Sequence, residues 1–552
     1  MTRRLRTPSH ALLMERSKSF LLWSTASLVV AFITLFVPAP AVAQDTLTIQ
    51  VEDLQRAISL VDGVMTKCFT GSNQRMYDTY DTSTSRGDGT ADVWPYTAAI
   101  EAHCSVMEAL ALMKESQPAL YAEHYDRFDS RLRKLIDNLA YYKGSFTLHS
   151  YAQVASWSVY GVHRSNAKGG ATVTGVENVY DDQMWLCREL VRAYRLTESR
   201  SYLNLATTLA NYCIDGWDCC LDANGNEYGG ISWGPGYNSK HSCSNGPLIQ
   251  PLIWLSEIYR TDDERAVLYY RWIDADGHRQ KEQRKRSDVY AEFAAKVYAW
   301  QKKHLLNTST GVYYDMLGAD NTLKYVTVDN MEYRTHVDTG NPGGTAYTYN
   351  SGTMLCGAAE LFRTTGNASY DTDLYNLSRS CYSRFGTQKR VDGERYRQYP
   401  TDSKATSGFN CWFNDVLMRA CVDVCAMSEQ SRFAESILED FQTNLDYAWE
   451  HYLVDGFLPI NLLTGWGDSP VTKGFHQLAF ASEYAMLSVW HERQQQATSV
   501  QQPIEETSPF DSAGSDAGIW DLRGQKVAES IQQSSFLPSG IYIVDGKKKW
   551  LW

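Results

Sequence analysis

The stretch Leu190-Val-Arg-Ala-Tyr194-Arg195, followed closely by Ser201-Tyr202, decides the fold of this sequence because it recurs. Related copies are Leu255-Ser-Glu-Ile-Tyr259-Arg260 before Asp262-Asp263, and Leu361-Phe-Arg-Thr-Thr-Gly366 before Ser369-Tyr370. Each copy has the pattern of one helix ending, a short polar turn and another helix beginning. The repeat therefore predicts a chain built from helical hairpins.

Outward from the repeat, apolar residues recur at helical spacing in about twelve segments, whereas strand signals between them are weak. Twelve helices in hairpin pairs predict an all-α fold, an (α/α)6 toroid with six inner and six outer helices. The long connections 143–179 and 215–242, rich in Gly and Trp, fall on alternate links and should line a groove at one end. The predicted helices lie near 51–68, 94–115, 121–143, 180–197, 200–215, 243–260, 287–304, 347–365, 369–384, 407–427, 430–451 and 474–494.

Residues 1–43 have the pattern of a secretory signal peptide. Basic residues between Arg3 and Lys18 precede an apolar run from Phe20 to Val37, and Ala41-Val42-Ala43 supplies small residues for cleavage. We therefore expect an exported protein, secreted or held at the cell surface, whose mature chain begins at Gln44. No other stretch is long enough to cross a membrane.

The charge of the chain excludes some classes of partner. The 552 residues carry a formal net charge of -12, and removal of the signal peptide makes it about -16. An acidic surface repels nucleic acids and anionic membranes, so a neutral polymer is the more natural partner. All 12 Cys follow the signal peptide, and we expect some of them to form disulfides. A zinc site at Cys213, Cys219, Cys220 and Cys243 is disfavoured because the chain has no Cys-x-x-Cys pair.

The composition changes after Gln496. Residues 497–515 are rich in Gln, Ser, Thr and Pro and are expected to link a catalytic domain, 44–496, to a tail, 516–552. In the tail, apolar residues alternate with turn residues, which predicts short strands. The tail resembles the C-terminal sorting domain of bacterial type IX secretion, which implies display at the cell surface.

The motif Tyr180-Asp181-Asp182-Gln183-Met184-Trp185 sets two adjacent carboxylates between aromatic residues at the start of a predicted helix. Hydrolysis of a glycosidic bond takes two carboxyl groups, one that donates a proton and one that attacks the sugar or activates water. The alternative role is helix capping, in which Asp side chains accept from free N–H groups at a helix start.

The adjacency of Asp181 and Asp182 favours a retaining over an inverting mechanism of glycoside hydrolysis. Neighbouring Cα atoms lie about 3.8 Å apart, so the carboxyls can sit near the roughly 5–5.5 Å typical of retaining glycosidases. Two carboxylates this close resist ionising together, so one should keep its proton to higher pH. The pair would thereby divide into an acid and a nucleophile.

Together with two further motifs, the Asp pair makes residues 50–495 resemble glycoside hydrolase family 76, bacterial endo-α-1,6-mannanases with an (α/α)6 fold. The further motifs are Gly229-Gly230-Ile231-Ser232-Trp233-Gly234, followed by Ser244-Asn245-Gly246, and Thr348-Tyr349-Asn350-Ser351-Gly352. The resemblance implies a retaining mechanism with Asp181 as nucleophile and Asp182 as acid/base. It implies neither a metal nor a cofactor.

Aromatic and amide side chains near the motifs are candidate sugar contacts, although core packing and helix capping are their common alternative roles. His241 and His336 match no Ser/His/Asp or metal pattern and are expected to be structural or solvated. The predicted substrate-binding residues are Trp94, Trp185, Trp233, Asn245, Tyr349 and Asn350, with Tyr96, Trp157, Tyr237 and Trp412 as further candidate platforms.

The leading functional hypothesis is a secreted mannan endo-1,6-α-mannosidase that cuts the backbone of fungal-type mannan. The first alternative is a mannan transglycosylase of the same fold. The second is a surface glycan-binding protein without turnover, which the intact Asp181-Asp182 pair disfavours because a pure binder has no need of two repelling carboxylates. Enzymes acting on uronates are disfavoured because no basic cluster stands beside the pair.

Overall fold

The computed structural model describes residues 48–71, 75–318, 322–404, 406–467 and 469–501, and the short tail segments 518–521, 525–528, 540–544 and 547–551. The predicted signal peptide and residues 502–515 of the predicted linker lie outside these ranges.

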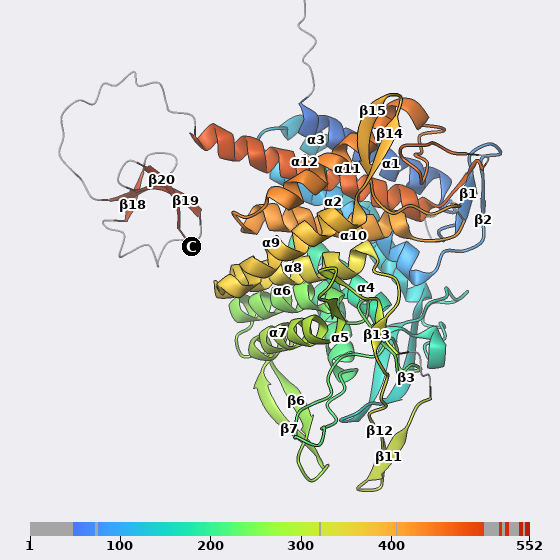
Figure 1. Cartoon of the computed structure of the whole chain (residues 1–552), viewed down its shortest axis with the longest axis vertical. Helices are drawn as coiled ribbons and strands as arrows, with labels where there is room; N and C mark the ends of the chain where they lie inside the picture. The colour runs from blue at the N-terminus through green and yellow to red at the C-terminus, as the bar shows by residue number, and fades with distance from the viewer. Residues whose placement is uncertain are drawn as a thin grey trace, which may run out of the picture. The chain divides into compact units, whose positions relative to one another are not determined.

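Twelve α-helices occur in the described part of the chain (Figure 1), one for each predicted segment. The all-α prediction and the order of the helices are confirmed. They are α1 (Ile49–Lys67), α2 (Val93–Leu112), α3 (Pro118–Asn138), α4 (Tyr180–Thr197), α5 (Arg200–Asp215), α6 (Gly246–Asp262), α7 (Arg286–Leu305), α8 (Thr348–Thr365), α9 (Ala368–Phe385), α10 (Asn410–Met427), α11 (Arg432–Tyr452) and α12 (Gly474–Gln501).

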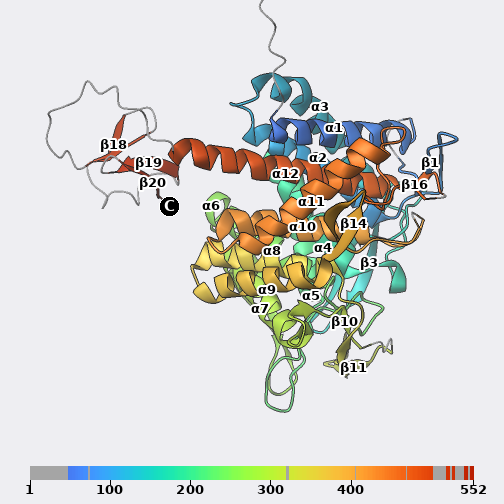
Figure 2. The ribbon, with the colours of Figure 1, turned by 45° about the horizontal axis from the view of Figure 1, so that its top comes forward.

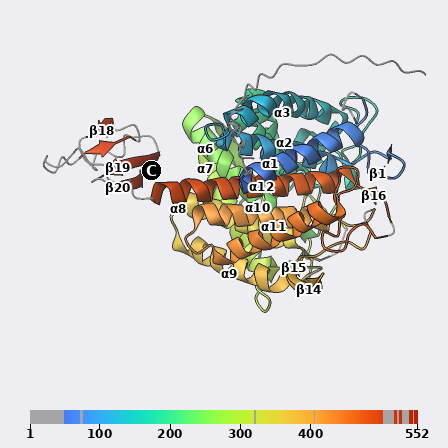
Figure 3. The same cartoon turned by 90° about the horizontal axis from the view of Figure 1, so that it is seen from above.

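The even-numbered helices form a closed inner ring, in which each helix contacts the next and α12 returns to α2. The odd-numbered helices pack outside, with α3 on α2, α5 on α4, α7 on α6, α9 on α8, α11 on α10 and α1 on α12. Figure 2 shows these paired layers, and Figure 3 shows α12 between α1 and α2 on one side and α10 and α11 on the other. This is the predicted (α/α)6 toroid.

The burial patterns explain which helices lie inside. Inner helix α2 is buried almost all round from Val93 to Leu110, as expected for a helix that is apolar on every face. Outer helix α3 buries a single stripe that includes Phe128, Leu132 and Leu135. At Gly352 of α8 an added Cβ would lie 2.9 Å from the carbonyl oxygen of Val416, so this glycine lets α8 and α10 approach closely.

Two of the three repeat copies are helical hairpins as predicted. The α4–α5 turn passes through Glu198 at a φ of 55°, and the α8–α9 turn passes through Gly366 at 65°. Asn367 then caps α9 by accepting from the Ser369 N–H at 3.0 Å. The prediction for Asp262-Asp263 was wrong, because a β-hairpin rather than a helix follows α6.

β-Hairpins are the main feature that the sequence reading missed. They pair short strands between helices, and their side chains are mostly half-exposed, so their apolar alternation is weak. The hairpins are β3 (Lys143–His149) with β4 (Val154–Tyr160), β6 (Val267–Ile273) with β7 (Arg279–Lys285), β11 (Tyr325–Val328) with β12 (Met331–Arg334), and β14 (Thr387–Val391) with β15 (Glu394–Gln398).

Shorter strands close three further sheets in the described residues. The sheet β13-β10-β5 joins Pro342–Gly343, Met316–Leu317 and Lys240–His241 beside the predicted active-site loops. The other two are β16-β1-β2 (Val471–Thr472, Thr79–Asp81 and Arg86–Asp88) and β8-β9 (Leu306–Asn307 and Val312–Tyr313).

The tail contains the short strands that the sequence predicted. They are β17 (Ile519–Trp520), β18 (Lys526–Ala528), β19 (Gly540–Val544) and β20 (Lys547–Leu551), in the order β18-β17-β19-β20. Helix α12 continues to Gln501 and so includes the first five residues of the segment predicted as a linker.

The expectation of disulfides was wrong for this structure. All twelve cysteines lie in the described residues as free thiols, and all but Cys425 are buried. Most are carried on helices that face the core, where cysteine packs as a small apolar residue. Burial raises the pKa of the Cys68 thiol to about 12, which keeps it protonated and unreactive.

Candidate active site

The N-terminal turns of the inner helices meet at one end of the ring. Trp94 of α2 packs against Phe413 of α10, with ring centroids 6.0 Å apart, and against Phe475 of α12 at 5.2 Å. Phe413 packs in turn against Tyr349 of α8 at 4.4 Å. This end of the toroid therefore gathers aromatic side chains from four of the six inner helices, and the Asp pair stands at the start of a fifth.

Asp181 and Asp182 lie in the first turn of α4, after the N-cap residue Val179. Neither carboxylate occupies the N-cap, and no side chain caps this helix start. Asp181 Oδ1 accepts from the neighbouring Asp182 N–H at 3.1 Å. Asp182 is only 7% exposed. A carboxylate that served as a helix cap would remain solvated, so the burial of Asp182 argues against a capping role.

The two carboxyls differ in how readily they ionise. Burial raises the pKa of Asp181 to about 6, and hydrogen bonds from the Cys243 thiol and the Trp233 indole oppose that rise. Burial raises the pKa of Asp182 well above its ordinary value, and the negative charges of Asp181 and Asp92 raise it further. Asp181 therefore ionises first while Asp182 keeps its proton, which is the division that acid and nucleophile require.

Trp233 is held against Asp181 by the loop between α5 and α6. Its Nε1–H donates to Asp181 Oδ2 at 3.3 Å, and its carbonyl oxygen accepts from the Tyr180 N–H at 2.8 Å. The ring packs on Tyr237 at 4.6 Å and on His241 at 4.9 Å. Burial lowers the pKa of His241 to about 4, so the imidazole is neutral and supports the indole as an uncharged ring.

The glycines of this loop allow its close approach to the helices. Gly230 has a φ of 77°, and an added Cβ would lie 2.3 Å from the ring of Trp300 on α7. Only glycine fits both conditions. The Gly-Gly motif therefore lets the segment that carries Trp233 pack directly against α7.

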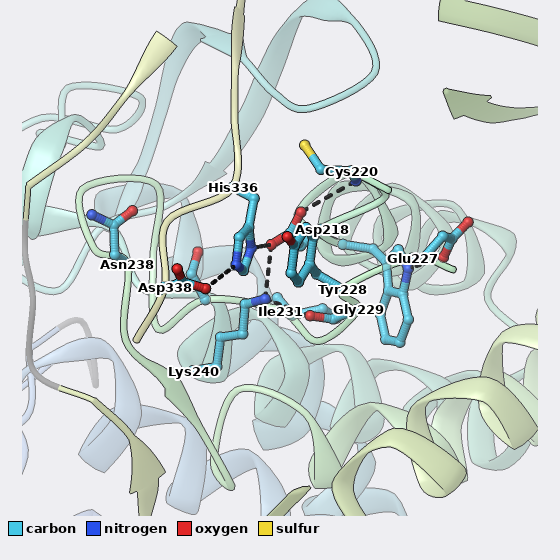
Figure 4. Close-up of polar contacts among 12 residues, drawn as sticks. Asp218, Cys220, Glu227, Tyr228, Gly229, Ile231, Asn238, Lys240, His336 and Asp338 are labelled. Atoms are coloured by element: carbon cyan, nitrogen blue, oxygen red, sulfur yellow. Dashed lines mark hydrogen bonds and ion pairs between the residues drawn. The ribbon is translucent and has the colours of Figure 1, made fainter. Parts of the chain in front are cut away.

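A buried cluster of charges anchors the other side of the same loop (Figure 4). Asp218 Oδ2 lies 2.8 Å from Lys240 Nζ and 2.6 Å from His336 Nδ1, and the ring of Tyr228 stacks on His336. Burial alone would raise the pKa of Asp218, but Lys240 and His336 hold it below its ordinary value. The cluster fixes β5, whose second residue His241 packs on Trp233, and gives His336 a structural role.

Sequence reasoning missed Asp315, and it considered Cys243 only as a disfavoured zinc ligand. Asp315 accepts from the Tyr349 hydroxyl at 3.1 Å, and burial raises the pKa of its carboxyl. The Cys243 thiol lies within hydrogen-bonding reach of both Asp181 and Tyr349, so Asp181 and Asp315 belong to one polar cluster. The sequence carried one signal for Asp315, since Tyr314-Asp315 repeats the aromatic–acid pair of Tyr180-Asp181.

Three predicted substrate-binding residues have their side chains engaged by the protein. The Asn245 amide accepts from the Ile231 N–H at 2.8 Å and donates to the carbonyl oxygens of Ile231 and His241. Asn350 is fully buried, and its side-chain amide donates to the carbonyl oxygen of Thr345 at 3.4 Å. Trp185 is 5% exposed and packs edge-on against Trp412 at 4.8 Å. These contacts give the three residues a supporting part in the site.

Trp94 lies in a wall of partly buried aromatic rings. Phe409 approaches its ring to 4.6 Å, and Phe413 lies nearly parallel to it. The sequence reading named Trp94 but not Phe409, Phe413 or Tyr347, although each stands at or near a helix start. Of the further candidate platforms, Tyr96 and Trp412 are buried in the core, Tyr237 packs on Trp233, and Trp157 lies elsewhere, on β4.

Comparison with known protein families gives one match. Residues 134–286 and 280–456 match glycosyl hydrolase family 76. No protein with a curated description matches the chain.

Several solved structures share the fold. A family 76 mannosidase from Bacteroides thetaiotaomicron is 20% identical, with a TM-score of 0.57 over 80% of this chain and 100% of that chain. The α-1,6-mannanase GH76A from Salegentibacter sp. HEL1_6 is 17% identical, with a TM-score of 0.50 over 79% and 99%. An inactive variant of that mannanase, with two adjacent aspartates replaced and α-1,6-mannotetrose bound, is 16% identical, with a TM-score of 0.51 over 79% and 99%.

Proposed function

The chain belongs to glycoside hydrolase family 76, and from that premise we propose that it is a retaining endo-α-1,6-mannanase acting on the backbone of fungal-type mannan. The observation that carries the proposal is the Asp181–Asp182 pair, in which one carboxyl ionises and its neighbour stays protonated. The Salegentibacter mannanase supports the choice of linkage, because its variant with two adjacent aspartates replaced is inactive and binds an α-1,6-linked mannooligosaccharide.

In the first step of the proposed reaction, the Asp181 carboxylate attacks the anomeric carbon. Asp182 donates its proton to the glycosidic oxygen, so the leaving chain departs as a neutral alcohol. In the second step, Asp182 takes a proton from water, which attacks the glycosyl ester of Asp181 and releases the sugar with its configuration retained. Trp233 and Cys243 hydrogen-bond to Asp181 and thereby hold the nucleophile in position.

An assay on linear α-1,6-mannan tests the proposal. We expect reducing ends to appear together with oligosaccharides of mixed length at early times, and NMR to detect the α-anomer as the first product. Release of mannose alone would contradict endo cleavage, and a β-anomer formed first would contradict retention. Products longer than the starting oligosaccharide would identify the enzyme as a transglycosylase, and absence of turnover would leave only glycan binding.

Export is a separate part of the proposal and rests on the sequence of residues 1–43 and of the tail. No helix in the described ranges is both long and apolar enough to cross a membrane. N-terminal sequencing of the protein recovered outside the inner membrane should begin at Gln44. Recovery of a chain that still begins with the apolar segment would contradict signal cleavage.

A further inference from the structure

A cavity of about 270 Å³ lies between the hairpins β3–β4 and β6–β7 and the helices α5 and α7. Trp157 of β4 and Asp215 of α5 form one wall, and Tyr270 and Arg271 of β6 form another. Phe293 of α7 also lines the cavity. The volume is close to the lower end of the roughly 300–1,000 Å³ of ligand pockets, which suits a small ligand.

This cavity is separate from the candidate active site. The ring of Tyr212 stands between Trp157, at 5.5 Å, and Tyr180, at 4.8 Å. Tyr180 is the residue before Asp181, so a layer of aromatic rings divides the cavity from the catalytic pair. The residues that line the cavity include none of those that surround Asp181 and Asp182.

Polar groups enter the cavity at fixed positions between the aromatic rings. Asp215 accepts from the Trp157 Nε1–H at 3.0 Å and from the Ser150 hydroxyl at 2.7 Å, so its carboxylate and the indole are locked together. Burial raises the pKa of Asp215 to about 6, and hydrogen bonds from Ser150, Gln153 and Trp157 oppose the rise, as does, to a smaller extent, the charge of Arg271. A carboxylate and a guanidinium thus line the same cavity, together with half-buried aromatic rings.

That combination selects one class of ligand. Asp215 would repel an anion, whereas Arg271 and Lys296, the second of which is paired with Glu227, would repel a cation. A purely apolar ligand would cover these polar groups without adding a hydrogen bond to them. A sugar has C–H faces that pack on aromatic rings and hydroxyls that both donate and accept hydrogen bonds. A neutral glycan satisfies every wall of the cavity.

We propose that the cavity between β4, β6, α5 and α7 is a second carbohydrate-binding site, which holds one or two hexopyranose units of a neutral glycan outside the active site. That the glycan is α-1,6-mannan rests on the proposed function. A polymer bound at this site has a raised effective concentration at the active site, which favours repeated cuts in one chain.

The test uses the double variant Asp181→Asn/Asp182→Asn, which prevents hydrolysis, and α-1,6-mannotetraose in isothermal titration. We expect two binding events per chain. Arg271→Ala, on an accessible strand, should weaken one event about 5- to 30-fold, the order expected from the loss of one good contact to a ligand. Trp157→Ala should do the same, and Tyr325→Ala, which removes an exposed aromatic ring from β11, should change neither event. Far-UV circular dichroism shows whether each variant is folded.

A crystal of the double variant soaked in mannotetraose gives a second measurement that needs no change in the cavity. Sugar density beside Trp157 and Asp215 is expected. A single binding event that Trp233→Ala weakens, with an empty cavity in the soaked crystal, would overturn the second site and leave the proposed function standing.

If wild-type protein neither cuts nor binds α-1,6-mannan, the proposed function fails. Titration with α-1,4-glucan, β-1,4-glucan and β-1,4-mannan oligosaccharides then tests whether the cavity binds another neutral glycan. Binding of one of them that Arg271→Ala weakens supports the second site, and binding of none overturns it.

Discussion

Trp233 Nε1–H donates a hydrogen bond to Asp181 Oδ2 at 3.3 Å, although the two residues are 52 positions apart in the chain. The Tyr180 N–H bonds to the Trp233 carbonyl oxygen at 2.8 Å and ties the same loop to the start of α4. The indole thus stabilises the charge of Asp181 while its ring lies beside the carboxylate. One side chain links the ionisation of the proposed nucleophile to the surface that would contact the sugar.

Asp181→Asn and Asp182→Asn should each abolish nearly all hydrolysis of α-1,6-mannan, because each removes one of two carboxyl roles. The losses should differ in kind. Without Asp182 a substrate with an activated leaving group still reacts in the first step, whereas without Asp181 no glycosyl-enzyme forms. Mass spectrometry of the intact protein detects that intermediate. Near-normal activity of both variants on mannan would contradict the catalytic assignment.

The pH profile of kcat/KM should have two limbs. Activity requires Asp181 ionised, so it should rise as the pH passes through about 6, the pKa of that carboxyl. It should fall at higher pH as Asp182 loses its proton. Rates measured from pH 4 to pH 10 on one oligosaccharide test both limbs. Full activity at pH 4 would show that Asp181 is not the titrating nucleophile.

The stability of the Asp182→Asn variant should exceed that of the wild type, and the difference should grow with pH. The folded state raises the pKa of Asp182 above its ordinary value of 3.8. Wild-type stability therefore falls as pH rises from that value through the folded pKa, and Asn has no such titration. Melting temperatures measured from pH 4 to pH 8 should diverge.

Asp276→Asn is the matched control for this prediction, because it makes the same substitution at an exposed turn. It should leave the melting temperature nearly unchanged at every pH. A constant difference between Asp182→Asn and wild type across the pH range would show that Asp182 is not held protonated by the fold.

Trp233→Ala should weaken the binding of mannooligosaccharides by about 1–2 kcal/mol, the order expected from the loss of one stacked aromatic face. The melting temperature should change little. Trp233→Phe keeps an aromatic face but removes the N–H donor, so it should raise the pKa of Asp181 and move the rising limb of the pH profile upward. A large fall in melting temperature with unchanged affinity would place Trp233 in the core.

A chain that ends at Gln501, where α12 ends, should keep its activity on mannan and its melting temperature. The prediction from sequence is that residues from about 497 onward are dispensable, because a polar linker joins units with separate cores. A chain that ends at Trp490 is the contrasting variant, since it loses Glu492, which accepts from the Ser116 hydroxyl at 3.0 Å. That chain should melt at lower temperature. If the chain ending at Gln501 unfolds or loses activity, the tail belongs to the catalytic domain.

Particular residues show why some predictions from the sequence agree with the structure and others do not. The helix start at Tyr180 and the turn at Gly366 were predicted because caps, turns and helical periodicity are local properties. The β6–β7 hairpin was missed after Asp262-Asp263, where a polar pair suited a helix start equally well. Asn245 was predicted as a sugar contact, yet its amide holds the backbone of Ile231. No local pattern distinguishes an amide that holds a loop from one that holds a ligand.

The sequence by itself determined the twelve helices, their hairpin order and the adjacent carboxylates of Asp181 and Asp182, because each of these features depends on a local pattern of neighbouring residues. Only the tertiary structure decided that Asp182 is buried and Asp181 hydrogen-bonded, that Asp315 and Cys243 join the site, and that Trp157 lines a different cavity. The twelve cysteines likewise proved to be free thiols only when the helices were packed. The physical reason is that burial, charge proximity and hydrogen-bond partners depend on residues brought together from distant segments by the closing of the inner ring.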